Sequence, residues 1–298
     1  MDKRVFWKMC KQKFKIMQKG YTRFRKSTFK AYYEEFCILE GYNDFSHELG
    51  QTMDGYIPQP SKPYLQFALL RIHEKAIKVF REATILMENG SASGAMARWR
   101  TLFELSVVSK VLLQYPELAE KYINYSKIDT YKVYKKLYEY RDKLDLVNYN
   151  FDNFKEIEQE YNCTKTTFGW NGKNSYEWAL NDDIKSANLF ELSKAVGLEH
   201  FYAYIDEAHM YNHPSARFLL NDRGAKASSE EDINYLFSPF EMHLPMQLIV
   251  SSLHQVNCSA ILGYAQLETA DQEQMKRFLE TNAMFPETII DIVTKKSK

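Results

Sequence analysis

Two long segments with the spacing of amphipathic α-helices lie in the first half of the chain and constrain its fold most strongly. YLQFALLRIHEKAIKVFREATILMEN repeats apolar residues at helical period until Gly90, and GAMARWRTLFELSVVSKVLLQY does so until Pro116. Glycine and proline, which often end helices, number only 11 and 8 in 298 residues, and no segment alternates strongly enough to predict a strand. The sequence therefore predicts an all-α protein, a multi-helix bundle.

Further helices are expected on both sides of these two segments. Helices over 3–19 and about 22–40, broken near Gly20, predict a basic hairpin appended to the bundle. The turn-rich stretch NDFSHELGQTMDGYIPQPSKP then separates a region at 1–60 from a bundle domain at 61–298. The remaining helices are expected over about 117–147, 183–196, 199–212, 240–268 and 271–294, with polar loops over 162–175 and 212–239.

Several classes of protein are disfavoured by what the sequence lacks. The four cysteines (Cys10, Cys37, Cys163 and Cys258) are far apart without CxxC spacing, so neither a zinc site nor a disulfide framework is indicated. The N-terminus has no apolar core of a signal peptide, and nowhere do about 18 apolar residues run together. GxGxxG, Walker and GxSxG motifs are absent as well. We therefore expect a cytoplasmic protein without a membrane span, and no cofactor.

The first 30 residues carry a strong positive charge. They hold eleven Lys and Arg residues and the single acid Asp2, although the whole chain is neutral with 39 basic and 39 acidic residues. Apolar residues recur among them at helical spacing, which predicts a basic amphipathic helix. Such a helix can dock on the acidic remainder of the chain, bind RNA or DNA, or attach to a membrane; without a lipidation signal, no membrane contact is expected. The candidate nucleic-acid-binding residues are Lys8, Lys11, Lys15, Arg23 and Arg25.

Arg100 and Glu104 stand in the middle of one of the most apolar segments of the chain. They are one helical turn apart, about 40° around the axis, and the apolar residues Val107, Val108 and Val111 share their face. A buried ion pair contributes little net stability. The two residues are therefore either a packing element or half of a functional site, because ionisable groups in a low dielectric serve catalysis and anion binding.

One later segment, EHFYAYIDEAHMYNHPSARF, carries a matching polar stripe. Its polar residues span an arc of about 60° on a continuous helix: Tyr202, Asp206, His209 and His213. Pro214 is expected to end that helix. His209 is interpreted either as a hydrogen-bonded side chain or as a general acid or base, whereas a metal is not expected because the ExxH pairs of di-iron bundles are absent. We predict that this stripe faces the charged pair of the earlier helix.

The order of these segments resembles that of an uncharacterised bacterial family of helical proteins. The similar segments are RTLFELSVVSKVLL, YINYSKIDTYKVYKKL and the Tyr/His segment ending in NHPS, with Trp170 and Trp178 before the last. That family is distantly similar to the HEPN class of helical bundles, whose members include metal-independent RNases of antiviral and toxin systems. Carried over position by position, the resemblance singles out Arg100, Glu104, His213, Tyr122 and Tyr125.

The sequence departs from the HEPN ribonuclease motif in one respect. That motif is an Arg followed after four to six residues by a His, and no His of this chain has an Arg at that distance upstream. RNA cleavage would need Arg100 to meet His209 or His213 from a different helix.

Two classes of function remain open from the sequence. In the first, the protein is an RNA-cleaving enzyme, in which Arg100 stabilises charge on the scissile phosphate, a His at 209 or 213 moves protons, and Glu104 orients one of them. In the second, the same residues bind a nucleotide or only stiffen the bundle, and the basic head recruits a partner. A defence or toxin role follows from the resemblance alone. The oligomeric state, whether a homodimer or a complex with a partner protein, is left open.

Overall fold

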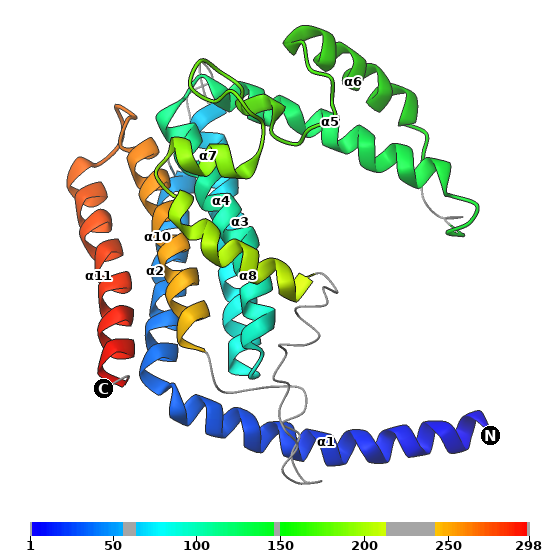
Figure 1. Cartoon of the computed structure of the whole chain (residues 1–298), viewed down its shortest axis with the longest axis vertical. Coiled ribbons are helices and arrows are strands. Elements are labelled where there is room, and N and C mark those ends of the chain that lie inside the picture. The colour runs from blue at the N-terminus through cyan, green and yellow to red at the C-terminus, as the bar shows by residue number, and fades with distance from the viewer. Residues whose placement is uncertain (1, 56–63, 146–149, 213–241, 297–298) are drawn as a thin grey trace.

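The computed structural model describes residues 2–55, 64–145, 150–212 and 242–296, without the side chains of 210–212. Within these residues the chain forms ten α-helices and no strand (Figure 1). The prediction of an all-α, multi-helix bundle is confirmed.

Five helices pack around one apolar core. α10 contacts α3, α4 and α11, while α2 lies against α3 and α11; their bounds are α2 (Tyr33–Gly55), α3 (Tyr64–Glu88), α4 (Ala92–Gln114), α10 (His243–Tyr264) and α11 (Gln272–Lys296). α10 is apolar on most of its circumference, which suits a helix enclosed by others. α3 approaches it closely at Gly263, where a Cβ atom would lie 2.2 Å from Leu69 Cδ1. The absence of a side chain at Gly263 therefore sets the distance between these two helices.

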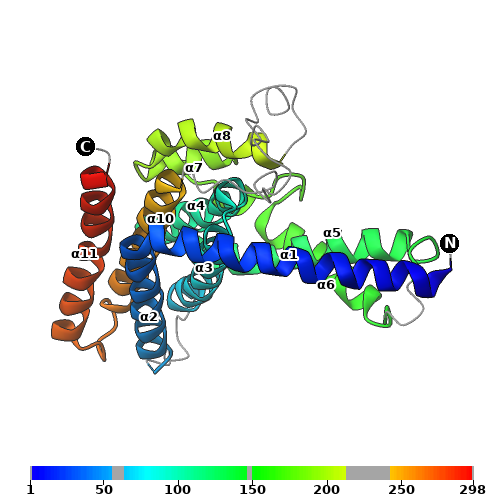
Figure 2. The ribbon, with the colours of Figure 1, turned by 90° about the horizontal axis from the view of Figure 1, so that it is seen from below.

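Two arms leave the bundle toward the same side, at its opposite ends (Figures 1 and 2). One is the single helix α1 (Lys3–Ala31), and the other is an antiparallel pair of α5 (Leu118–Glu139) and α6 (Phe154–Phe168). Stacked rings join the pair, with Tyr131 and Tyr161 centroids 4.1 Å apart. The shorter helices α7 (Leu189–Ala195) and α8 (Tyr202–Asn212) pack on α4.

The N-terminal helices differ from their predicted bounds. The expected break near Gly20 is absent, because one glycine costs an exposed helix only about 1 kcal/mol and the rest of this long helix supplies many good helix formers. The break falls at Tyr32, where Lys296 of α11 donates to the carbonyl oxygen of Ala31 and to the fully buried carboxylate of Glu35. The two helices predicted as one hairpin thus separate: α1 projects outward and α2 joins the bundle core.

α1 does not lie along the acidic remainder of the chain, which was one of the predicted arrangements. Thr28 is the only buried residue of α1 among its described positions, and the described contacts of this helix with the bundle lie near its C-terminal end. The predicted turn-rich stretch after it is also largely helical, since α2 continues to Gly55. Some polar residues of this stretch are buried in the core: Ser46 is fully buried and accepts a hydrogen bond from Asn257 Nδ2 at 3.0 Å. The predicted loop at 162–175 likewise begins inside α6.

A polar network centred on Asn282 crosses the core. Its Oδ1 accepts hydrogen bonds from the Tyr42 hydroxyl at 2.6 Å and from Asn257 Nδ2 at 3.1 Å, and its Nδ2 donates to the His254 carbonyl oxygen at 3.2 Å. Pro286 in α11 has no N–H to bond the backbone carbonyl of Asn282, and His254 Nδ1 lies 3.2 Å from that oxygen. The network therefore satisfies a carbonyl that the proline leaves without a partner and ties α2, α10 and α11 together.

His73 of α3 is predicted to make folding pH-dependent. Burial lowers its pKa from 6.5 to about 4, because the imidazolium would lose its hydration. Between these values the unfolded chain binds a proton that the folded chain does not. Stability present above pH 6.5 is therefore lost as the pH falls toward 4, by up to roughly 3 kcal/mol from this residue.

Urea unfolding at pH 7 and at pH 4.5 measures this loss. The His73→Gln variant should lose less stability between the two pH values than the wild type does. The control variant His200→Gln, at an exposed position, should lose as much stability as the wild type. An equal loss in wild type and His73→Gln would contradict the prediction. An NMR titration of the His73 ring in the unchanged protein gives its pKa without any substitution.

Candidate functional site

Arg100 of α4 and His209 of α8 meet in the structure. Arg100 Nε donates a hydrogen bond to His209 Nε2 at 2.8 Å, and both side chains are half-buried. A guanidinium has no acceptor atom, so His209 Nε2 must be unprotonated and the neutral ring carries its proton on Nδ1. The contact predicted between the charged pair and the polar stripe is present at these two residues.

Glu104 bonds to a residue outside the predicted polar stripe. No ion pair joins it to Arg100 in the described part of the chain, and instead its Oε1 accepts a hydrogen bond from the Tyr176 hydroxyl at 2.6 Å. Tyr176 precedes the short 3₁₀ helix η1 (Glu177–Ala179), and burial together with the Glu104 carboxylate raises its pKa. Arg100 and Glu104 therefore do not pair with each other, because each side chain reaches a separate element from α4.

Tyr202 and Asp206 complete the side of α8 next to these residues. Burial raises the pKa of Tyr202, the positive charge of Arg100 lowers it, and Asp206 and Glu104 raise it. Tyr202 thus lies within the electrostatic reach of both members of the α4 pair, whereas Asp206 is exposed to solvent. The described stripe consists of a half-buried phenol, an imidazole bonded to arginine, and an exposed carboxylate.

Of the two α5 tyrosines singled out by the sequence, one lies near the site. Tyr122 packs edge-on against Trp178 with centroids 4.8 Å apart, and burial and the charge of Glu104 raise its pKa to about 12. Tyr125 instead holds the loop after α6: its hydroxyl donates to the carbonyl oxygen of Asn174, and its ring packs edge-on against Trp170 at 5.1 Å. We assign Tyr125 a structural role.

Sequence reasoning missed Tyr176. Its position depends on a folded-back loop in which Glu177 Oε2 accepts a hydrogen bond from the Gly172 backbone N–H at 2.8 Å. Gly172 adopts φ +73°, a left-handed conformation that favours glycine. The segment FGWNGKNSYEW could have pointed to this loop, because two Trp residues and two Gly residues flank the tyrosine. Its contact with Glu104, 72 residues away in the chain, has no local signal.

The candidate nucleic-acid-binding residues of α1 are exposed along the projecting helix. They are Lys8, Lys11, Lys15, Arg23 and Arg25. Lys11 lies over the ring of Trp7, 5.2 Å from its centroid, and Arg25 Nη2 is 3.8 Å from a carboxylate oxygen of Glu88 in α3. Four of the five therefore have no carboxylate within ion-pair distance in the described chain, whereas Arg25 contacts the bundle.

Two predictions about the site depend on residues outside this description. His213, and with it the full stripe as a metal site, lies outside the described residues. In the described ranges no three His, Cys, Asp or Glu side chains gather in a group that could hold a metal ion. Across those same ranges, every helix is too short or too polar to span a bilayer.

The fold and site define a helical bundle with a polar cluster between α4 and α8. Residues 66–228 match a family of unknown function, DUF5677, and the chain belongs to this family. The matched region contains Arg100, Glu104, Tyr176 and His209, whereas α1 lies outside it. No curated protein and no solved structure matches the chain. The family assignment therefore supplies no activity, and function must be argued from the site.

Proposed function

We propose that this protein binds RNA and cleaves it at the Arg100–His209 pair. The observation that carries the proposal is the 2.8 Å hydrogen bond between Arg100 Nε and His209 Nε2 in a half-buried setting. A guanidinium binds phosphate oxygens through two parallel N–H groups, and a neutral imidazole is the side-chain base that works near neutral pH. Together they supply what phosphodiester cleavage requires: a fixed positive charge and a proton acceptor.

The chemistry can be written from these two side chains and the substrate. Among described residues, the terminal nitrogens of Arg100 have no hydrogen-bond partner, so they can bind the non-bridging oxygens of a phosphodiester. When the guanidinium turns to the phosphate, His209 Nε2 accepts the proton of the ribose 2′-hydroxyl. The 2′-oxygen attacks phosphorus, the bond to the 5′-oxygen breaks, and that oxygen takes a proton from the imidazolium. The products are a 2′,3′-cyclic phosphate and a 5′-hydroxyl.

Glu104 acts in this proposal through Tyr176. The short hydrogen bond between them fixes the phenol beside the pair, and the raised pKa of Tyr176 keeps it protonated as a donor. Glu104 is thus a positioning residue. Replacement by glutamine removes its charge but keeps an acceptor, and is expected to reduce cleavage without abolishing it.

The resemblance to HEPN bundles agrees with this proposal in a specific way. Their ribonuclease motif brings an Arg and a His together on one helix, whereas Arg100 and His209 come together from two helices. By analogy we extend the proposal to a cytoplasmic, metal-independent RNase of bacterial defence or toxin systems. Labelled single-stranded RNA incubated with the purified protein in EDTA tests it. Cyclic-phosphate ends are expected, and intact RNA would contradict cleavage.

A non-enzymatic module is the alternative function. The bonds of Arg100 to His209 and of Glu104 to Tyr176 also give each of these four side chains a partner within the protein, as a packing cluster does. RNA or nucleotide binding without cleavage would support this alternative.

Removing α1 is predicted to weaken RNA binding by about 10-fold or more at low salt. The lysines and arginines of this helix would neutralise RNA phosphates, and each neutralised phosphate releases counterions, which favours binding. Lys8, Lys11 and Lys15 lie along one exposed side of the helix, and their triple replacement by Ala should have much of the same effect. Fluorescence anisotropy of labelled RNA between 50 and 200 mM salt measures it, and the salt dependence should become shallower. A matched triple variant at exposed lysines elsewhere, Lys155, Lys185 and Lys276, should bind normally. Equal loss in both variants would contradict a specific role for α1.

A further inference from the structure

A groove of about 860 Å³ lies at the C-terminal end of α1, next to the start of α2 and the end of α3. Residues of all three helices line it, among them Lys26, Phe29 and Lys30 of α1, Tyr33 of α2 and Glu88 of α3. Those of α1 and α2 are exposed to solvent, so a ligand can reach them. The volume of the groove falls in the range of sites for small-molecule ligands, about 300 to 1,000 Å³.

Two aromatic rings are accessible in this groove. Tyr33 is 58% exposed and Phe29 is 42% exposed. Their rings meet edge-on, with centroids 5.8 Å apart and an interplanar angle of 73°, so they form a corner. Phe29 also stacks on the fully buried ring of Phe36, with centroids 5.4 Å apart, and this contact holds its ring in place. The corner therefore presents two fixed aromatic surfaces against which a flat ring can stack.

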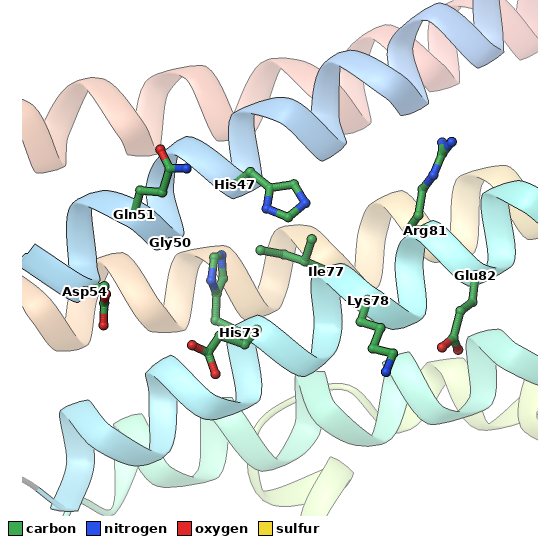
Figure 3. Close-up of a pocket in the computed structure, with 10 residues that line it drawn as sticks. His47, Gly50, Gln51, Asp54, His73, Ile77, Lys78, Arg81 and Glu82 are labelled. Carbon is green, nitrogen blue, oxygen red and sulfur yellow. The ribbon is translucent and has the colours of Figure 1, made fainter.

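The groove carries an excess of positive charge. Glu88 is the only acid among the described residues that line it, and its carboxylate oxygens lie 3.8 Å from Arg25 and 3.8 Å from Arg81. Figure 3 shows Arg81 reaching from α3 toward α2. In the described chain, Lys26 and Lys30 have no carboxylate within ion-pair distance. The acid is thus already neutralised, and two cations can meet the phosphates of a ligand.

The groove continues a stripe of lysines along α1. Residues three or four apart lie on one face of a helix, and one such series is Lys8, Lys11, Lys15, Lys19, Thr22, Lys26 and Phe29. From its first to its last residue the series covers about 32 Å of helix. The lysines to which the proposed function assigns RNA binding therefore lead into the groove. Proteins that bind single strands combine the same two parts, a positively charged track for the backbone and aromatic rings for the bases.

We propose that the groove binds unpaired bases of an RNA strand whose backbone follows the lysine stripe of α1. A base stacks on the ring of Tyr33 or Phe29, and the phosphates on either side of it contact Lys26 and Lys30. A duplex keeps its bases stacked inside, so it engages the lysines alone. The protein therefore selects single-stranded over double-stranded RNA. This inference rests on the RNA binding of the proposed function and not on the cleavage step.

Two oligonucleotides test the proposal with the full chain. One is a single 2′-O-methyl RNA strand of about 12 nucleotides, long enough to cover the stripe, and the other is its duplex with the complementary strand. Neither can be cleaved through a 2′-hydroxyl, so binding is measured apart from cleavage. Fluorescence anisotropy gives both dissociation constants. At about 200 mM salt, where the electrostatic contribution is reduced, the wild type should bind the single strand more tightly than the duplex.

Variants of the protein locate the bases. Tyr33→Ala should weaken binding of the single strand by about 10-fold and leave binding of the duplex unchanged, because only unpaired bases stack. Tyr33→Trp keeps a stacking surface and should bind as the wild type does. Replacing Lys26 and Lys30 together with Ala should weaken binding of both oligonucleotides. The matched control is Tyr64→Ala, at an exposed aromatic residue of α3 outside the groove, which should have no effect.

The outcomes separate this site from the proposed function. Equal single-strand binding by the wild type and Tyr33→Ala would overturn the base site and leave RNA binding by α1 in place. An equal loss for single strand and duplex in Tyr33→Ala would also reject the site, because stacking on unpaired bases cannot produce it. If the wild type bound neither oligonucleotide, the RNA binding of the proposed function would fail, and this site with it.

Discussion

Replacing His209 with alanine is expected to lower the rate of RNA cleavage by at least about 100-fold, the usual contribution of a general base. Arg100→Ala should lower it by about 100- to 1,000-fold, because the charge that develops on the phosphate loses its fixed donor. Both side chains meet in one hydrogen bond, so the double variant should be little slower than the more damaged single one. Single-turnover cleavage of labelled RNA at saturating protein measures these rates.

Folding controls separate this prediction from a structural role. Glu104 keeps its bond to Tyr176 when Arg100 is removed, so Arg100→Ala should lower the free energy of unfolding by only about 1 kcal/mol. A larger loss, of about 3 to 5 kcal/mol, would be expected only if a charge were left buried and unpaired. Arg98→Ala, on the same helix with its side chain on Glu82, is the matched control and should cleave RNA normally. Equal rates of RNA cleavage by the wild type and by His209→Ala would contradict the role of His209 as the general base.

Replacing Asn282 with alanine should cost about 4 kcal/mol of stability, among the larger effects of a single substitution. The side chain is fully buried and holds the Tyr42 hydroxyl, Asn257 Nδ2 and the His254 carbonyl oxygen. Truncation leaves the Tyr42 hydroxyl buried without an acceptor, at roughly 1 to 3 kcal/mol. It also removes one hydrogen bond each from Asn257 Nδ2, which keeps Ser46, and from the His254 carbonyl oxygen, at about 1 kcal/mol each, and it leaves a small cavity. Urea unfolding followed by circular dichroism measures the change in the free energy of unfolding.

The neighbouring residue supplies the control for this second prediction. Thr281→Ala, at an exposed position one residue earlier in α11, should change stability by less than about 0.5 kcal/mol. If Asn282→Ala unfolds at the same urea concentration as Thr281→Ala, the network does not hold α2, α10 and α11 together as described.

Helical period was sufficient to predict the fold class, because the apolar stripes of α3 and α4 extend over many turns, and Gly90 and Pro116 mark where the two helices end. Element ends were predicted less well where long-range contacts decide them. The break at Tyr32 depends on Lys296, from the far end of the chain, and no nearby residue signals it. Asn43, Asp44 and Ser46 look like turn residues in sequence, yet α2 continues through them because two of the three are buried in the bundle.

In the candidate site, too, features with a local sequence pattern could be predicted and those set by long-range contacts could not. Arg100 and His209 could be paired from sequence, because each is a polar residue on a helix that must bury its neighbours. The true partner of Glu104 could not be predicted, since Tyr176 reaches it from an irregular loop that Gly172 and Glu177 fold back. The burial of His73 was also missed: the sequence shows a histidine in an apolar helix, but only the packing shows that Gly50 of α2 lies against its ring.

The most direct test of the central claim compares two oligonucleotides of one sequence, RNA and its 2′-O-methyl form, incubated with the wild-type protein in EDTA. Mass spectrometry of the fragments identifies their ends. We expect cleavage of the RNA to fragments with 2′,3′-cyclic phosphates and no cleavage of the 2′-O-methyl strand, because the ribose hydroxyl is the nucleophile. Cleavage of both strands, or of neither, would contradict an Arg100–His209 site that acts through the 2′-hydroxyl.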